Sequence, residues 1–289
     1  MEYTRVAARL RVQIARFSGE LSAGLPKVAR RLVSEMVYGI QASQSVVLTK
    51  IARALEEDVR VKKTEERLSR QLGRGSLGAV VQRNLLKEGA SRIGRNTLLI
   101  FDSSDLRKRY AKRMEYLCTV RDGSEKELGP GYWLTQVVGA EAGGEELVPL
   151  YGALYSTEAP GFTSENKEWM TVVDAVSGAV SKRGVWVMDR GGDRKEIVLG
   201  MLDRGLRFLI RMRGDRHIVA GRSIMNVAEA AASCPCPYAE TVVKEEGGKE
   251  RVYHIEFGFR KVRFPGREEV LYLVVVNGFG KEPLMLLTT

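Results

Sequence analysis

The amino-acid sequence predicts an α/β protein, in which a helical N-terminal region precedes a mixed sheet with flanking helices and a β-rich insertion. Three observations support this fold class. Apolar residues recur at helical spacing in the first third of the chain, short apolar runs alternate with helical segments from residue 97, and β-rich segments broken by glycines follow residue 214. We therefore expect three regions, at residues 1–96, 97–213 and 214–289.

Two short helices are expected near the middle of the first region. The apolar residues of VVLTKIARALEED recur at helical spacing: Val47, Leu48, Ile51 and Leu55. After a break at residues 59–63, Thr64-Glu65-Glu66 indicates an N-cap and an acidic first turn of a second helix. Two such helices separated by a turn are typical of a helix-turn-helix contact with DNA.

The charge of the chain is unevenly distributed. The formal net charge is +10, and residues 1–96 contain 19 Lys and Arg against 9 Asp and Glu, whereas residues 97–289 contain 27 of each. Such asymmetry indicates an N-terminal module that faces a polyanion, most plausibly nucleic acid. A membrane surface is less well supported, because this region has no long basic helix with a Trp or Phe face.

Basic residues in and before the second helix are the candidate DNA-binding residues. They are Lys62, Lys63, Arg67, Arg70 and Arg74. Arg67, Arg70 and Arg74 fall at i, i+3 and i+7, on one face of a helix, where they could contact phosphates. The alternative is an ordinary charged face exposed to solvent, and the charge of the whole region favours DNA over it.

Composition excludes several classes of protein. The sequence has no apolar run of eighteen residues, which argues against a membrane span, and its start lacks the apolar core of a signal peptide. Three cysteines do not make a disulfide framework, so a cytoplasmic setting is expected. Cys-Pro-Cys at 234–236 has no second pair of ligands nearby, which makes it a structural or loop segment rather than a zinc site.

From residue 97 the pattern becomes that of an α/β sheet. The expected strands are 97–101, 132–139, 147–155, 185–188 and 206–212, and residues 283–289 form one more. Ser164 is expected to cap a helix over 165–181, which Gly184 ends. A further helix over 193–204 follows the fourth strand, and Asp193 is its expected cap.

Two of the apolar strands end in aspartate, at Asp102 and at Asp189. Taken alone, an aspartate after a strand is commonly a helix cap or a turn residue, and Asp102-Ser103-Ser104-Asp105 is rich in turn formers. If the two strands are neighbours, the carboxylates meet at the strand ends and repel each other unless a cation lies between them. Mg²⁺ prefers a couple of carboxylates together with water and phosphate oxygens. The pattern therefore indicates a divalent metal site for phosphoryl transfer.

At this point the chain resembles a known family. TLLIFDSSDLRKRYAKRMEYL, GYWLTQVVGAE and VWVMDRGGD are similar to segments of the DDE-type transposases of bacterial insertion sequences, and SVVLTKIARALEED with TEERLSRQL is similar to their N-terminal region. The resemblance implies a ribonuclease-H-like core in which the first and fourth strands are adjacent and parallel. It also implies that Asp102 and Asp189 match the first two acids of the catalytic triad and bind Mg²⁺, or Mn²⁺ in its place, with Asp105 a weaker substitute for Asp102.

The third acid of that family is missing from this sequence. The family places a Glu in a Tyr-x-x-Arg-x-x-x-Glu pattern after its β insertion, and this spacing does not occur here. Glu268, Glu269 and Glu282 lie in strand and loop surroundings that suit the role poorly. The resemblance thus implies a transposase core that lacks its end, in which apolar sheet surface is exposed unless a partner chain or dimerisation covers it.

Three functions remain open on this basis. The first is a DNA transposase that binds the inverted repeats at transposon ends, cleaves and transfers strands into target DNA, acts as a homodimer on double-stranded DNA, and associates with the bacterial nucleoid in the cytoplasm. The second is a catalytically inactive, truncated transposase that acts as a DNA-binding relic or inhibitor. The third is an unrelated Mg²⁺-dependent nuclease of the same fold, which would need a third acid elsewhere.

Overall fold

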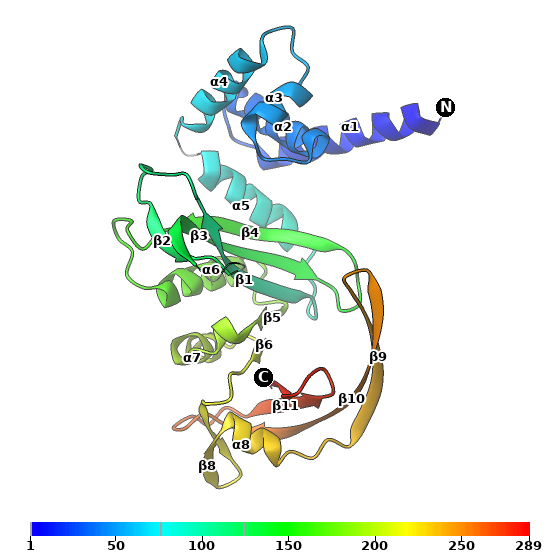
Figure 1. Ribbon diagram of the computed structural model, residues 1–289, viewed down its shortest axis with the longest axis vertical. Coiled ribbons are helices and arrows are strands. Elements are labelled where there is room, and N and C mark those ends of the chain that lie inside the picture. The colour runs from blue at the N-terminus through cyan, green and yellow to red at the C-terminus, as the bar shows by residue number, and fades with distance from the viewer. Residues whose placement is uncertain (1, 76, 124, 126) are drawn as a thin grey trace. The chain divides into compact units, whose positions relative to one another are not determined.

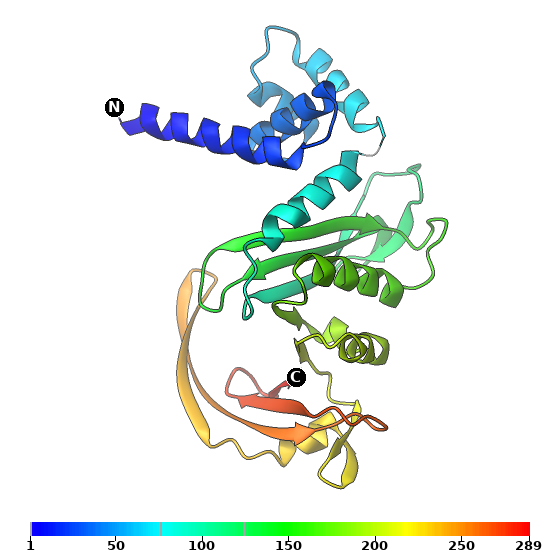
Figure 2. The same ribbon diagram turned by 180° about the vertical axis from the view of Figure 1, so that it is seen from behind.

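The computed structural model describes residues 2–75, 77–123, 125 and 127–289. It separates into two compact units (Figures 1 and 2). The first, here called the helical unit, comprises Met1–Arg92 together with Pro149–Tyr151, and the second, the sheet unit, comprises Ile93–Val148 and Gly152–Thr289.

The helical unit is built on a small apolar core. Its helices are α1 (Glu2–Leu21), α2 (Lys27–Ser43), α3 (Leu48–Ala54), α4 (Val61–Leu72) and α5 (Leu77–Ala90). Leu32 of α2, Ile51 and Ala52 of α3, and Leu68 of α4 are fully buried together. Helices α2 and α3 approach closely, since a Cβ at Gly39 would lie 2.4 Å from Cγ2 of Ile51. Within the part of the chain that the structure describes, none of the helices is long and apolar enough to cross a membrane.

Helix α4 begins earlier than the sequence indicates. Its first residue is Val61, which packs against the core, and Thr64 lies inside the helix with 1% of its surface exposed. The Thr64 hydroxyl donates to Oε2 of Glu57 at 2.8 Å and does not cap the helix. The prediction of an N-cap at Thr64 is therefore wrong, because burial of Val61 favours one more turn at the start of α4.

The sheet unit alternates strands and helices before a run of strands. Its elements are β1 (Leu98–Arg107), β2 (Cys118–Arg121), β3 (Leu128–Ala140), β4 (Leu147–Tyr155), α6 (Glu165–Ala179), β5 (Val185–Met188), the 3₁₀ turn η1 (Arg190–Gly192), α7 (Lys195–Asp203), β6 (Phe208–Arg211), β7 (His217–Ala220), β8 (Ser223–Asn226), α8 (Val227–Ala232), β9 (Tyr238–Glu246), β10 (Lys249–Val262), β11 (Leu271–Asn277) and β12 (Leu284–Thr288).

The order of strands in the main sheet is β2-β3-β1-β5-β6-β12-β11-β10-β9, and β4 pairs with β3. Strand β5 is parallel to β1, and β6 is parallel to β5, whereas β3 is antiparallel to β1. The strands at 98–107 and 185–188 are therefore adjacent and parallel, as the resemblance to a ribonuclease-H-like core implies. The mixed α/β class predicted from the sequence, with its N-terminal helices, is confirmed.

The β-rich segment continues the same sheet. Strand β12 pairs antiparallel with β6, so that Leu287 lies opposite Ile210 and both side chains are fully buried. Helix α8 interrupts this segment and was not expected from the sequence. Its signal is a capping box, in which the Asn226 side chain accepts from the Glu229 N–H and the Glu229 carboxylate accepts from the Asn226 N–H.

The two faces of the central strands differ in burial. On one face Phe101, Met188 and Ile210 are buried, and helix α6 lies against this face (Figure 2). The Phe101 and Trp169 rings are 4.7 Å apart there. On the opposite face, Ile100, Val187 and Leu209 form a paired row across β1, β5 and β6 and are only half-buried.

Candidate metal centre and nucleic-acid interface

Asp102 and Asp189 occupy matching positions on two neighbouring strands. Phe101 pairs with Met188 in the parallel register, and Asp102 and Asp189 are the next residues along each chain. Phe101 and Met188 are buried on the α6 face, and both aspartates are exposed. Side-chain alternation directs Asp102 of β1 to the other face, whereas Asp189 is the first residue after β5. The structure thus places the two predicted residues directly after paired positions of two neighbouring strands.

Strand β1 does not end at Asp102, contrary to the prediction. It continues to Arg107 because β3 pairs with it along its whole length, and Asp102 lies opposite Gln136. The segment Asp102-Ser103-Ser104-Asp105 is therefore extended, and the alternative that it forms a loop is wrong. Asp102 lies within a strand, paired with β3 and one residue beyond the last position of β1 that pairs with β5, and its Oδ2 accepts a hydrogen bond from the Ser104 hydroxyl at 2.6 Å.

Asp189 does cap a turn, as the alternative interpretation of this residue holds. Its Oδ1 accepts from the Gly191 N–H at 2.7 Å and caps η1. The close fit requires glycine, because a Cβ at Gly191 would lie 2.9 Å from that oxygen and 3.2 Å from the Trp169 ring. A carboxylate has about four lone-pair sites, so this hydrogen bond leaves Asp189 able to bind a cation as well.

The donor set suits Mg²⁺ or Mn²⁺. Two exposed carboxylates that follow paired positions of neighbouring strands offer the hard oxygen ligands these ions prefer, and water and phosphate oxygens can complete an octahedron. A third protein ligand is not found beside these two carboxylates. Across residues 2–75, 77–123, 125 and 127–289, no group of three or more His, Cys, Asp or Glu side chains is placed to hold a metal ion.

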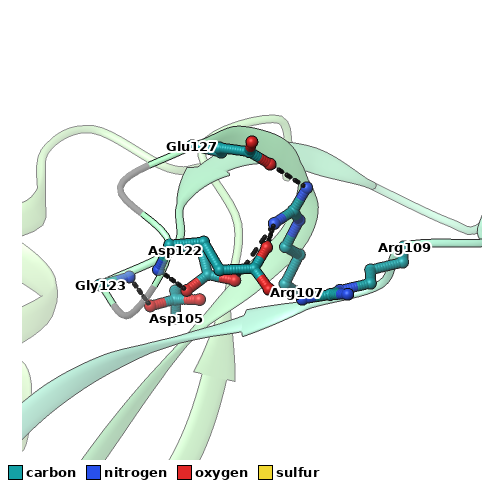
Figure 3. A network of polar contacts seen from close by, with 7 residues as sticks. Asp105, Arg107, Arg109, Asp122, Gly123 and Glu127 are labelled. Atoms are coloured by element: carbon teal, nitrogen blue, oxygen red, sulfur yellow. Dashed lines mark hydrogen bonds and ion pairs between the residues drawn. The ribbon is translucent and has the colours of Figure 1, made fainter.

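Asp105 serves a different contact. It lies three residues beyond Asp102 on the opposite face of β1, and its Oδ1 accepts from the Gly123 N–H at 3.1 Å (Figure 3). The neighbouring Arg107 joins Asp122 at 3.2 Å and Glu127 at 3.1 Å. These hydrogen bonds raise the pKa of the Arg107 guanidinium. Asp105 therefore belongs to the network that fastens the β2–β3 hairpin to β1.

Asp193 is not a helix cap, contrary to the prediction. Helix α7 begins at Lys195 after Arg194, and the Asp193 side chain is fully buried. Its Oδ2 accepts from the Arg213 backbone N–H at 2.8 Å, and its Oδ1 forms an ion pair with the Arg216 guanidinium. These contacts come from the loop that follows β6. They offset the free-energy cost of burying the Asp193 carboxylate away from water.

Arg194 fastens the same turn to helix α6. Its Nε donates to the Gly191 carbonyl at 3.0 Å, and its Nη1 donates to Oε2 of Glu165 at 2.7 Å. The guanidinium lies 4.4 Å from the centroid of the Trp169 ring.

Tyr155 of β4 also contacts Glu165. Burial raises the pKa of Tyr155 to about 12, so its phenol stays protonated and donates to Oε1 of Glu165 at 3.4 Å.

The candidate DNA-binding residues fall into two groups in the helical unit. Arg67 pairs with Glu35 at 2.7 Å and with Glu57 at 3.0 Å, and its side chain is 26% exposed. These carboxylates raise the pKa of the Arg67 guanidinium, Glu35 contributing most. The remaining four are exposed and make no ion pair with any other residue that the structure describes: Lys62, Lys63, Arg70 and Arg74. Arg74 lies just beyond the end of α4.

Sequence reasoning missed the residues that hold the turn after Asp189. Arg213 and Arg216 belong to the segment RGDR that follows the strand LRFLIRM. Arginines directly after a strand of the same sheet are a usable signal, since such loops gather at one sheet edge. The sequence does not show that these arginines bind Asp193, because it predicts that Asp193 caps a helix.

Comparison with known proteins gives a structural similarity but no match in sequence. No protein-family model matches the sequence, and no curated protein does. The chain is similar to a solved structure of the piggyBac transposase in a synaptic complex with hairpin DNA, with 11% sequence identity and a TM-score of 0.46. The match covers 88% of this chain and 52% of the other, so the chain spans about half the length of that protein.

Proposed function

We propose that the protein is a DNA transposase of the DDE type, as found in bacterial insertion sequences. The observation that carries this proposal is the parallel register of β1 and β5, in which Asp102 and Asp189 each follow directly on the paired residues Phe101 and Met188. The resemblance of the sequence segments around both residues to that family supports it. So does the basic charge of residues 1–96, which suits a polyanionic substrate.

The reaction follows from this arrangement. Asp102 and Asp189 would hold Mg²⁺, or Mn²⁺ in its place, and such an ion would supply stabilisation of the charge on the attacking and leaving oxygens of a phosphodiester. Water attacks the phosphorus at the end of the element, and the 3′ oxygen leaves and takes a proton. The freed 3′-OH then attacks a phosphodiester of the target DNA in the same manner. Lys62, Lys63, Arg70 and Arg74 contact phosphates of the transposon ends.

A catalytically inactive DNA-binding relative is the second candidate function. The observation that favours it is that the carboxylate pair has no third acid beside it among the residues described. Such a protein occupies the inverted repeats or joins mixed multimers with an active transposase, and it binds end DNA without cutting it. Homodimerisation on DNA and association with the bacterial nucleoid belong to both proposals.

The test uses DNA from both sides of the coding region, because an insertion sequence carries its ends next to its gene. Both candidates predict that the purified protein binds this DNA in gel-shift assays; the transposase also nicks it in Mg²⁺ or Mn²⁺, whereas the inactive relative does not. Asp102→Asn and Asp189→Asn should each abolish any cleavage and weaken Mn²⁺ binding measured by electron paramagnetic resonance, whereas Asp105→Asn should not.

The outcomes separate the candidates. Strong Mg²⁺-dependent nicking of end DNA that Asp189→Asn abolishes would establish an active transposase and rule out the inactive relative. Binding of end DNA without cleavage favours the inactive relative. Cleavage that ignores the end sequence would instead indicate a nuclease of the same fold, and loss of Mn²⁺ binding in Asp105→Asn alone would contradict the site itself.

A further inference from the structure

We propose that Asp193 is a positioning residue for the metal-binding carboxylate of Asp189. It acts by clamping the turn at residues 189–193 onto the loop at residues 213–216. This inference rests on the proposed function, because it assigns a role toward the metal that Asp102 and Asp189 would share. It adds a residue that neither the sequence resemblance nor the carboxylate pair itself identifies.

The turn after β5 is short and closely tied to Asp189. The Gly191 N–H donates to the Asp189 carboxylate at 2.7 Å, and the Gly192 N–H donates to the Asp189 carbonyl at 3.0 Å. The Asp193 N–H donates to the Arg190 carbonyl at 3.3 Å. Asp193 therefore ends the same turn whose amide orients the Asp189 carboxylate, and a shift at one end moves the other.

The loop after β6 holds Asp193 by several contacts. The Arg213 N–H and the Arg216 guanidinium donate to its two carboxylate oxygens. Nη2 of Arg216 also donates to the Asp193 carbonyl at 2.8 Å. A further bond joins Nε of Arg213 to the Arg190 carbonyl at 3.2 Å. The loop at residues 213–216 thus binds both the Asp193 side chain and the backbone of the turn at residues 189–193.

The clamp is itself anchored to the fold. The Val227 N–H donates to the Arg216 carbonyl at 2.9 Å, and the Ala228 N–H donates to the Gly214 carbonyl at 2.9 Å. Both donors belong to the first turn of α8, whose Val227 is fully buried. Because the Asp193 side chain is fully buried as well, its bonds face little competition from water. Groups that fix a metal ligand from behind typically change metal affinity 10–100-fold when removed.

The experiment measures Mn²⁺ binding to the full chain by electron paramagnetic resonance of the free ion, together with thermal unfolding. The test variants are Asp193→Asn, which removes the charge, and Arg216→Lys, which keeps the charge but cannot donate to the Asp193 carboxylate and to the Asp193 carbonyl at once. The matched control is Asp174→Asn, which breaks an aspartate–arginine pair with Arg204 in the same unit, joining α6 to the end of α7.

We expect both test variants to raise the Mn²⁺ dissociation constant by about ten-fold or more, while Asp174→Asn leaves it unchanged even if it lowers the melting temperature. Wild-type affinity in folded Asp193→Asn would overturn the inference. If Asp193→Asn does not fold, Arg216→Lys decides in the same way. Mn²⁺ binding by the wild type that is insensitive to Asp102→Asn and Asp189→Asn would instead defeat the proposed function, so the two failures are distinguishable.

Discussion

The fate of each arginine in the helical unit depends on what surrounds its side chain. Arg67 lies at the edge of the buried face of α4 and links Glu35 of α2 to Glu57 of the α3–α4 loop. Arg70, one turn further along the same helix, is exposed. Arg67 and Arg70 look equivalent in the sequence but have different surroundings. Arg67 stabilises the helical unit through its ion pairs, whereas Arg70 is available to contact a phosphate.

Substitution should separate these two roles. Arg67→Ala leaves two partly buried carboxylates without their partner, and we expect it to lower the free energy of unfolding by about 1–3 kcal/mol. Arg70→Ala should change stability by less than about 0.5 kcal/mol. It should instead lower the slope of log K against log salt for end DNA by about one. Denaturant unfolding and salt-dependent gel shifts measure the two effects, and equal salt slopes for both variants would contradict the assignment.

At the scale of elements, α6 shows how local sequence and tertiary packing agree. Ser164 caps the helix by accepting from the Lys167 N–H at 3.2 Å, as predicted from the sequence. Trp169, Val173 and Val176 form its buried side, and Ser177 accepts from the indole N–H of Trp186 at 3.2 Å. The helix therefore packs against β1 and β5, the two strands that lead to Asp102 and Asp189.

Removal of the cap tests this element alone. Ser164→Ala should lower the free energy of unfolding by about 1 kcal/mol, because it leaves an N–H at the helix start without its acceptor. Ser164→Asp should retain most of that stability, since aspartate caps as well as serine. Denaturant unfolding of the three proteins makes the comparison, and a loss in Ser164→Asp as large as in Ser164→Ala would show that capping is not the cause.

At the scale of the whole molecule, ion pairs make stability depend on pH. The hydrogen bond from Thr64, followed by those from Arg67, lowers the pKa of Glu57 below its ordinary value of 4.5. Arg204 likewise lowers the pKa of Asp174 below 3.8. A carboxyl whose pKa is lower in the folded protein adds stability above its unfolded pKa, and that stability is lost as the pH falls through the folded value.

We therefore expect the melting temperature to be steady near neutral pH and to fall as the pH drops below about 4.5. The Glu57→Gln variant should be less stable than the wild type at neutral pH. Its stability should fall less on acidification, because glutamine has no carboxylate that can be protonated. Thermal unfolding followed by circular dichroism over this range measures both. Glu66→Gln, on the exposed face of α4, is the control and should keep the wild-type dependence.

The half-buried row of Ile100, Val187 and Leu209 predicts that the protein associates with another chain through this face of the sheet. Apolar sheet surface that stays in contact with water favours a second copy of the chain or another partner. We expect size-exclusion chromatography with light scattering to show a mass above that of the 32.2 kDa chain, rising with concentration. A stable monomer at all concentrations would contradict this expectation.

The sequence by itself determined the local elements and the distribution of charge. Strands β4 and β5 begin and end where the apolar runs do, and the cap of α6 is local, because each depends on residues within a few positions of one another. The same holds for the choice of Asp102 and Asp189 as candidates, since the apolar run before each is visible in the sequence. Their roles at a metal site stay predictions.

Only the tertiary structure decided which side chains meet. It made β1 and β5 neighbours, extended β1 to Arg107 by pairing with β3, and turned Asp193 from an expected cap into a buried partner of Arg216. Arg67 likewise pairs with Glu35, 32 positions away, rather than with solvent. Such contacts join residues far apart in sequence, and their energy comes from burial that no local pattern reports.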